Sequence, residues 1–261
     1  MAEIATTRKE ARLDGQVVMI TGAGMGMGRT HAHVLAKRGA AVIVHDIDAK
    51  AAERTAGEIR AEGGAAQTAI CDVADVAAIH REVKAAERTL GRIDVLVNNA
   101  GIHNSRALED ITEADLDRMY RVHVKGAFFA SQAVVPGMKA RRSGRIIHIS
   151  SAWGVAGNHI DSHYCGAKAA MLGLAKAMAL ELHPWGILVN AIAPGMVMTE
   201  MTRINRKPEV LKEFADKLIP LGRLAEPEEL SFAVAFLASA ESAFITGQVL
   251  SPNGGEFIVG Y

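Results

Sequence analysis

The fold of this chain is decided by the stretch Gln16-Val-Val-Met-Ile-Thr-Gly-Ala-Gly-Met-Gly-Met-Gly28. Its apolar first half predicts a strand, its glycines predict a tight turn, and the pattern from Arg29 to Lys37 predicts a helix. Glycines in such a turn let backbone N–H groups approach a pyrophosphate, and the positive end of the following helix attracts its charge. The stretch therefore predicts a site for the phosphates of a dinucleotide.

Asp46 ends the next apolar run, Ala41-Val-Ile-Val-His-Asp46, at about the twenty-residue distance where a dinucleotide fold has its ribose-binding carboxylate. A carboxylate there accepts hydrogen bonds from both ribose hydroxyls and repels a 2′-phosphate. The neighbouring residues 45–48 offer no strongly basic clamp for such a phosphate. The pattern favours NAD over NADP, although Asp46 could instead only cap the strand end.

Apolar β-rich runs and helical stretches alternate strictly along the chain. Strands are predicted at about 16–21, 41–46, 66–70, 93–97, 144–149 and 186–192, and helices at about 26–38, 48–62, 75–90, 112–140 and 162–183. Right-handed crossovers then produce a parallel sheet with helices on both faces and ligands at the carboxyl ends of the strands. We predict a single-domain α/β fold with a Rossmann-like, doubly wound sheet.

Composition limits the partners and the compartment. The 261 residues suit one large domain, and 29 basic residues balance 29 acidic ones, so no net field attracts nucleic acid or an anionic membrane. Two cysteines are too few for a disulfide framework and fit a cytoplasmic protein. We predict that residues 1–12 form a flexible tail and that residues 13–261 form the domain. We expect no membrane span and no metal site.

Tyr164 and Lys168 lie four residues apart, which places both on one face of a helix. A neighbouring ammonium favours the phenolate and brings proton exchange by the tyrosine toward neutral pH. Ser151 lies thirteen residues before Tyr164, directly after an apolar run. A hydroxyl that binds an oxygen and a phenol that exchanges its proton are the groups that carbonyl chemistry needs.

From about Leu13 to Gly255 the chain resembles the short-chain dehydrogenase/reductase family. The shared motifs, in order, are Thr21-Gly-x-x-x-Gly-x-Gly28, Cys71-Asp72-Val73, Asn98-Asn-Ala-Gly101, Ser151, Tyr164-x-x-x-Lys168 and Pro194-Gly-x-x-x-Thr199. The resemblance implies that 245–250 is a seventh strand, that 196–221 covers the substrate, and that long helices at 112–140 and 162–183 build a homotetramer. It also implies that a dinucleotide, which Asp46 predicts to be NAD, is bound by Gly22, Gly26, Met27, Gly28, Asp46, Asp72, Val73, Asn99, Gly101, Tyr164, Lys168, Pro194, Gly195 and Thr199.

The family's catalytic roles fall on Ser151, which polarises the substrate oxygen, on Tyr164, the general acid/base, and on Lys168, which also binds the nicotinamide ribose. Ser150 is the rival for the serine role, but the spacing to the tyrosine selects Ser151. His123 stands where the family normally has an asparagine that holds water in a proton relay. Its imidazole could replace that amide, because histidine both donates and accepts hydrogen bonds, or it could only pack.

Two further motifs have a purely structural alternative: 98–101 could be a polar turn closing a strand, and Pro194-Gly195 could be a simple turn. Polar residues around the serine and tyrosine, with Trp153 and His159 as expected substrate contacts, predict a hydroxylated or charged substrate.

The sequence therefore predicts an NAD-dependent enzyme that interconverts a polar secondary alcohol, such as a polyol or hydroxy acid, and its ketone. Two rivals remain: an NADPH-dependent 3-oxoacyl-carrier reductase and a non-catalytic NAD-binding sensor.

Overall fold

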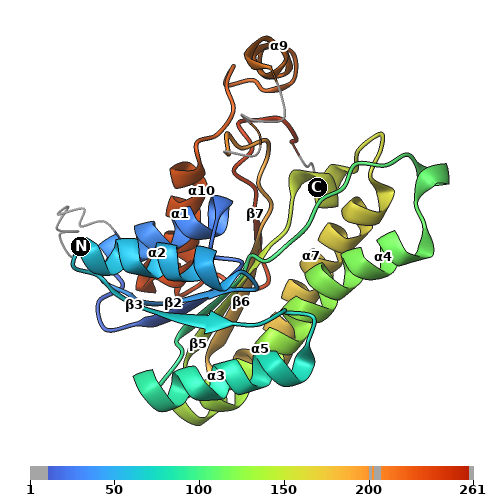
Figure 1. The fold of residues 1–261 in the computed structure, drawn as a ribbon. Coiled ribbons are helices and arrows are strands. Elements are labelled where there is room, and N and C mark those ends of the chain that lie inside the picture. The colour runs from blue at the N-terminus through green and yellow to red at the C-terminus, as the bar shows by residue number, and fades with distance from the viewer. Residues whose placement is uncertain (1–10, 200–201, 203–206, 259–261) are drawn as a thin grey trace, which may run out of the picture.

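A seven-stranded parallel sheet forms the centre of the protein, as a computed structural model shows for residues 11–199, 202 and 207–258 (Figure 1). The strands are β1 (Val17–Thr21), β2 (Ala41–Asp46), β3 (Ala65–Ile70), β4 (Val95–Asn98), β5 (Gly144–Ile149), β6 (Ile187–Ile192) and β7 (Val249–Leu250). Their order is β3-β2-β1-β4-β5-β6-β7, so the winding reverses between β1 and β4. The predicted doubly wound α/β fold is confirmed, and its ligand crevice belongs at this reversal.

Both faces of the sheet are covered by helices, because successive side chains of each buried strand point to opposite faces. Val18 and Ile20 of β1 pack with one set of helices, whereas Val17 and Met19 pack with the other. The first face carries α1 (Gly26–Lys37), α2 (Ala49–Ala61) and α10 (Pro227–Ala238), and the second carries α3 (Val76–Leu90), α5 (Gly126–Arg141) and α7 (Ser162–Leu182) (Figure 1).

Side-chain caps fix where several helices begin. Asp48 accepts hydrogen bonds from the backbone of the first turn of α2, and Asp75 does the same for α3. Thr112 and Asp115 form a reciprocal capping box at the start of α4 (Glu113–Tyr120). The helix predicted over 112–140 is in fact α4 and α5, joined by the π-helical turn Arg121–Lys125.

The structure adds elements that the sequence pattern did not predict. These are α6 (Ala152–Ala156), α9 (Pro208–Leu218), α10 and the 3-10 turns Leu108–Asp110, His183–Trp185 and Ala240–Ser242. The predicted strand 245–250 shortens to β7, because Gly247 adopts a left-handed φ of 70° and Thr246 bonds β6 through its side chain. Of the tail predicted over 1–12, residues 1–10 lie outside the described part of the chain. Ala11 is described and is buried. None of the described helices is long and apolar enough to span a membrane.

Candidate functional site

The glycine turn between β1 and α1 is shaped for close approach by a ligand. Gly22 and Gly26 have left-handed φ values of 64° and 54°, which glycine adopts without strain. A Cβ on Gly28 would lie 2.1 Å from the Gly22 carbonyl oxygen, so the helix packs directly on the turn. A Cβ on Gly26 would meet nothing within 4 Å, and this open cradle at the start of α1 fits a pyrophosphate.

Asn99 fastens this turn to the end of β4, at the point where the sheet reverses. Its side-chain Nδ2 donates to the carbonyl oxygens of Thr21 (2.9 Å) and Gly22 (3.1 Å), while its backbone N–H donates to the Thr21 hydroxyl. A Cβ on Gly101 would lie 2.4 Å from Cε1 of His123, so the glycine leaves room for that imidazole. The motif 98–101 therefore has a structural role whatever else it binds.

Asp46 ends β2 with its carboxylate buried beside the glycine turn. The Gly24 amide donates to Oδ2 at 2.8 Å and the Asp48 amide donates to Oδ1 at 3.0 Å. Each oxygen keeps a further lone pair for a ribose hydroxyl, so the geometry suits the predicted role. Asp72 follows β3 and accepts from the Ala74 amide, and the buried Val73 packs against Gly126.

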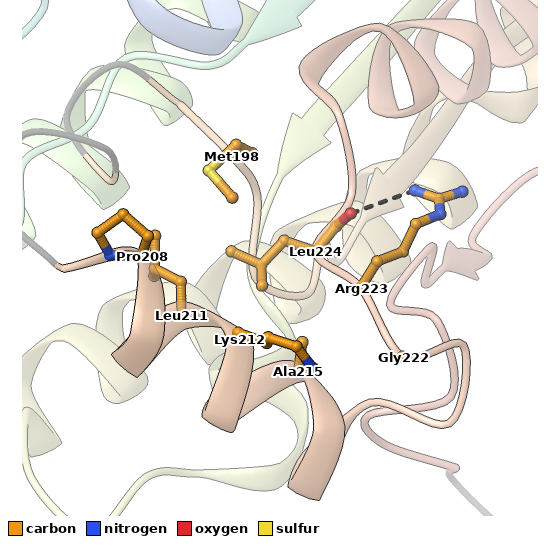
Figure 2. Close-up of a pocket in the computed structure, with 8 residues that line it drawn as sticks. All are labelled: Met198, Pro208, Leu211, Lys212, Ala215, Gly222, Arg223 and Leu224. Carbon is orange, nitrogen blue, oxygen red and sulfur yellow. Dashed lines mark hydrogen bonds between the residues drawn. The ribbon is translucent and has the colours of Figure 1, made fainter.

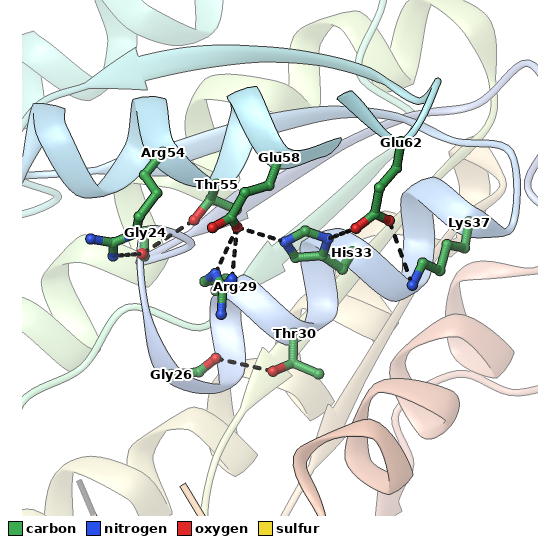
Figure 3. Close-up of polar contacts among 10 residues, drawn as sticks. All are labelled: Gly24, Gly26, Arg29, Thr30, His33, Lys37, Arg54, Thr55, Glu58 and Glu62. Carbon is green, nitrogen blue, oxygen red and sulfur yellow. Dashed lines mark hydrogen bonds and ion pairs between the residues drawn. The ribbon is translucent and has the colours of Figure 1, made fainter. Parts of the chain in front are cut away.

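A polar network between α1 and α2 borders the same turn (Figure 3). Glu58 pairs with Arg29 and bonds His33, so the first basic residue after the turn is neutralised. Arg54 donates from Nη2 to the Gly24 carbonyl at 3.1 Å, and the Thr55 hydroxyl donates to the same oxygen. Residues 45–48 therefore give no sign of Arg54, whose cation reaches this turn from α2.

Three side chains at the ends of β5 and within α7 form the candidate catalytic centre. Ser151 caps α6 and its Oγ accepts from the Trp153 amide at 3.2 Å, while Tyr164 and Lys168 share one face of α7. The Ser150 hydroxyl is buried and donates to the Lys168 carbonyl at 2.7 Å. Ser150 therefore ties β5 to α7, which leaves Ser151 as the serine beside Tyr164.

The titration of this pair differs from the sequence expectation. Burial raises the pKa of Tyr164 to about 12, against the opposing effect of a hydrogen bond with Ser151. Burial also lowers the pKa of Lys168 to about 7. Its Nζ donates to the Ile149 carbonyl at 2.9 Å and lies 5.6 Å from the centre of the Tyr164 ring. The expected shift of the tyrosine pKa toward neutral pH is wrong, because desolvation of the phenol outweighs its hydrogen bond with Ser151.

His123 lies in the π-helical turn, a feature that often occurs at functional sites. Its ring is buried, 5.6 Å from that of Tyr164, and its Nε2 bonds the backbone of Ile102. Burial first, and then the charge of Lys168, lower the pKa of His123 to about 3, so the ring is neutral at physiological pH. Its Nδ1 is buried without a partner among the described residues.

The other predicted contacts lie around this centre. The Trp153 ring is 6.2 Å from that of Tyr164, whereas His159 is exposed on the loop before α7. After β6, the Pro194 carbonyl accepts from the Ala152 amide, and a Cβ on Gly195 would lie 2.7 Å from Oε2 of Glu256. Thr199 and Thr202 share a hydrogen bond between their hydroxyls.

The segment predicted to cover the substrate, 196–221, contains α9; residues 200–201 and 203–206 lie outside the described part of the chain. A cavity of roughly 310 Å³ opens between α9 and the residues after it (Figure 2). Its lining is Met198, Pro208, Leu211, Lys212, Ala215, Gly222, Arg223 and Leu224. None of the three candidate catalytic side chains lines it, so it is separate from their centre.

Comparisons with known proteins agree with this geometry. A family model described as "Enoyl-(Acyl carrier protein) reductase" matches residues 22–256. The chain is 40% identical over 244 residues to a 3-oxoacyl-[acyl-carrier-protein] reductase of Thermotoga maritima, covering 94% of this chain and 98% of that one. It is 38% identical over 257 residues to a galactitol 2-dehydrogenase of Agrobacterium fabrum, covering 95% and 99%.

A solved structure has the same fold at closely similar size. It is a gluconate 5-dehydrogenase of Burkholderia cenocepacia in complex with NADP and tartrate, with a TM-score of 0.90, 37% identity, and coverage of 95% of this chain and 97% of that one. The family match and these relatives together make the chain an oxidoreductase acting on alcohols or ketones, and it belongs to the short-chain dehydrogenase/reductase family.

Proposed function

We propose that this protein is an NAD-dependent enzyme that interconverts a polar secondary alcohol and its ketone. The observation that supports this most is the approach of Ser151 and Tyr164 to each other, with Lys168 buried beside them. The Ser151 hydroxyl binds the substrate oxygen, and Tyr164 takes its proton during oxidation or returns it during reduction. The dinucleotide, held by the glycine turn and Asp46, supplies the hydride acceptor or donor when bound.

A polar substrate is supported by two relatives whose names specify galactitol and gluconate, both polyhydroxylated compounds. Spectroscopic measurement of NADH formation by the purified protein, with polyols, hydroxy acids and hydrophobic alcohols in parallel, tests the proposal. Turnover of polyols or hydroxy acids is expected. A preference for the hydrophobic alcohols would contradict the assigned substrate class.

The proton that Tyr164 takes up needs a path to solvent, and His123 suits one end of it. An ammonium has three donor hydrogens, and among the described residues the Lys168 ammonium donates to the Ile149 carbonyl alone. A buried ring nitrogen normally has a partner, and a water molecule between Nδ1 of His123 and the lysine would satisfy both groups. We therefore assign His123 to the relay.

We expect His123→Asn to retain turnover within about threefold, because its amide can hold the same water, and His123→Leu to lose about tenfold or more. The rates are compared in steady-state assays at saturating dinucleotide. Equal activity of the two variants would show that His123 only packs.

Asp46 is expected to set the choice of cofactor. In Asp46→Ala, the repulsion of a 2′-phosphate disappears while the Arg54 cation remains, so the ratio of kcat/KM for NADP to that for NAD should rise about a hundredfold. The ratio is measured in the same preparation, so a loosened glycine turn affects both cofactors alike.

The matched control is Asp46→Ala combined with Arg54→Ala, which should lose most of the gain with NADP while changing use of NAD little. A wild-type protein that already prefers NADPH would contradict the role given to Asp46. It would favour the runner-up, a 3-oxoacyl-carrier reductase, which the 40% identity to the Thermotoga maritima enzyme supports.

We also propose a homotetramer in the cytoplasm. Leu116, Tyr120 and Phe128 expose 42%, 39% and 40% of their surface along α4 and α5, beside a cavity of roughly 410 Å³, and a second copy would cover them. Both cysteines, Cys71 and Cys165, are free thiols, as suits a reducing compartment.

A further inference from the structure

His103 and Asp161 form a hydrogen-bonded pair beside the candidate catalytic tyrosine. Nε2 of His103 lies 3.0 Å from Oδ2 of Asp161, whose side chain is only 1% exposed. The imidazole contacts the Tyr164 ring edge to face, with 4.9 Å between the ring centres, and lies 6.0 Å from the Trp153 ring. The pair therefore joins the loop after β4 to the start of α7 next to the reacting centre.

The backbone of Asp161 has an unusual conformation. It has a left-handed φ of 67° although it is not glycine, and such a backbone persists only where its surroundings fix it. Its carboxylate also accepts from the Arg106 amide at 2.8 Å and from the Ser105 hydroxyl at 3.0 Å. These two bonds already tie the loop to α7, so His103 is not needed for that purpose.

The second ring nitrogen of His103, Nδ1, is available for a further hydrogen bond. A carboxylate only accepts, so Nε2 carries the hydrogen in the bond to Asp161, and Nδ1 is bonded by none of the described residues. The side chain is 37% exposed, in contrast to the buried carboxylate behind it. Nδ1 can accept from a hydroxyl when the ring is neutral, or donate to a carboxylate when the ring is charged.

Another polar side chain next to Tyr164, that of His163, is less accessible. His163 is buried and its Nε2 bonds the Asn104 side chain, which in turn donates to Asp115. Of the polar residues around Tyr164, His103 thus combines closeness to the phenol, partial exposure and a free ring nitrogen.

We propose that His103, oriented by Asp161, binds a second oxygen of the substrate, one or two carbons from the carbon that exchanges hydride. The substrates are then diols or hydroxy acids rather than simple alcohols, because only these present a second hydroxyl or carboxylate oxygen to Nδ1. This inference rests on the proposed function and makes its substrate class specific. Asp161 acts through the imidazole and is a positioning residue.

The test compares butane-2,3-diol and 3-hydroxybutanoate with butan-2-ol, which has the same carbon chain but one oxygen. In His103→Phe, which keeps a ring against Tyr164 but lacks nitrogens, the kcat/KM for the diol and the hydroxy acid relative to butan-2-ol should fall about tenfold or more. His103→Leu should show the same fall, so the result does not depend on one variant folding well. The diol and the hydroxy acid distinguish a hydroxyl from a carboxylate as the bound group.

The matched control is Ser105→Ala, which removes another donor to the same Asp161 carboxylate but no group beside Tyr164. Its ratio should equal that of the wild type. An unchanged ratio in both His103 variants, or an equal fall in Ser105→Ala, would overturn the inference while leaving the proposed function intact. A wild-type protein that oxidises neither these three compounds nor any polyol or hydroxy acid of the first panel, with either dinucleotide, would overturn both.

Discussion

Tyr164→Phe is expected to lower kcat by about a thousandfold, within the range that general acid–base catalysis contributes. The substitution removes only the phenol oxygen and keeps the ring that packs against His103, His123 and Trp153. Tyr164 is only one of many expected cofactor contacts, and the glycine turn and Asp46 are untouched, so NADH affinity should change little. Steady-state turnover and NADH fluorescence titration measure the two quantities separately.

Tyr120→Phe is the matched control, because Tyr120 lies on α4 at the surface and has no place in the catalytic centre. Its turnover should equal that of the wild type. Tyr164→Phe turning over at the wild-type rate would remove the acid/base assignment. If the same variant also kept a dinucleotide-dependent cellular function, the protein would be the non-catalytic sensor rather than an enzyme.

The pKa of Tyr164 also determines how the rate of oxidation depends on pH. The phenolate is the form that accepts a proton from an alcohol, and burial raises its pKa to about 12. At physiological pH the base form is scarce in the unliganded protein, so kcat/KM for oxidation should rise as the pH increases. A positive charge placed beside the ring would favour the phenolate and shift this rise to lower pH.

Features that depend only on a few neighbouring residues could be predicted from the sequence. The glycine turn, the carboxylate at the end of β2, and the helical spacing of Tyr164 and Lys168 each need only local geometry, and the structure has all three in place. Helix α10 was missed for a physical reason. It packs against both α1 and the sheet, so its sequence lacks the polar stripe that identifies a surface helix.

Features that depend on distant contacts could not be predicted. Arg54 reaches the Gly24 carbonyl across 30 positions, and His103 reaches Asp161 across 58. The left-handed backbone of Asp161 has no signal in its residue type beyond the tolerance of aspartate for this region. The predicted direction of the Tyr164 pKa shift was wrong for the same reason, since the spacing reveals the neighbouring lysine but not the desolvation that raises the pKa of the phenol.

Lys168→Met is expected to lower kcat about a hundredfold, because the variant loses the cation beside Tyr164 and the donor at that end of the relay. A Lys176→Met control on the same helix, where the side chain is exposed, should retain activity. Loss of activity alone would not show whether Lys168 acts as a fixed cation or exchanges its proton near neutral pH. The dependence of stability on pH separates these two.

Burial lowers the pKa of Lys168 from its ordinary value of 10.5 to about 7, so the folded state releases a proton that the unfolded state keeps between those values. Unfolding then takes up a proton in this range, and the free energy of unfolding contributed by Lys168 rises with pH from about 7 to about 10.5. Below that range the buried ammonium destabilises the fold in full. Met has no charge to desolvate, so the gain in Tm of Lys168→Met over wild type should be largest near pH 6 and shrink toward pH 10.

The lost hydrogen bond from Nζ to the Ile149 carbonyl lowers the stability of Lys168→Met at every pH. It therefore shifts the whole curve but leaves its slope, and the slope is the quantity that reports the buried charge. Lys176→Met should show no such slope. A difference in Tm between Lys168→Met and wild type that stays constant from pH 6 to pH 10 would mean that Lys168 keeps its proton throughout, and that it acts on Tyr164 as a fixed cation rather than as a group that exchanges protons near neutral pH.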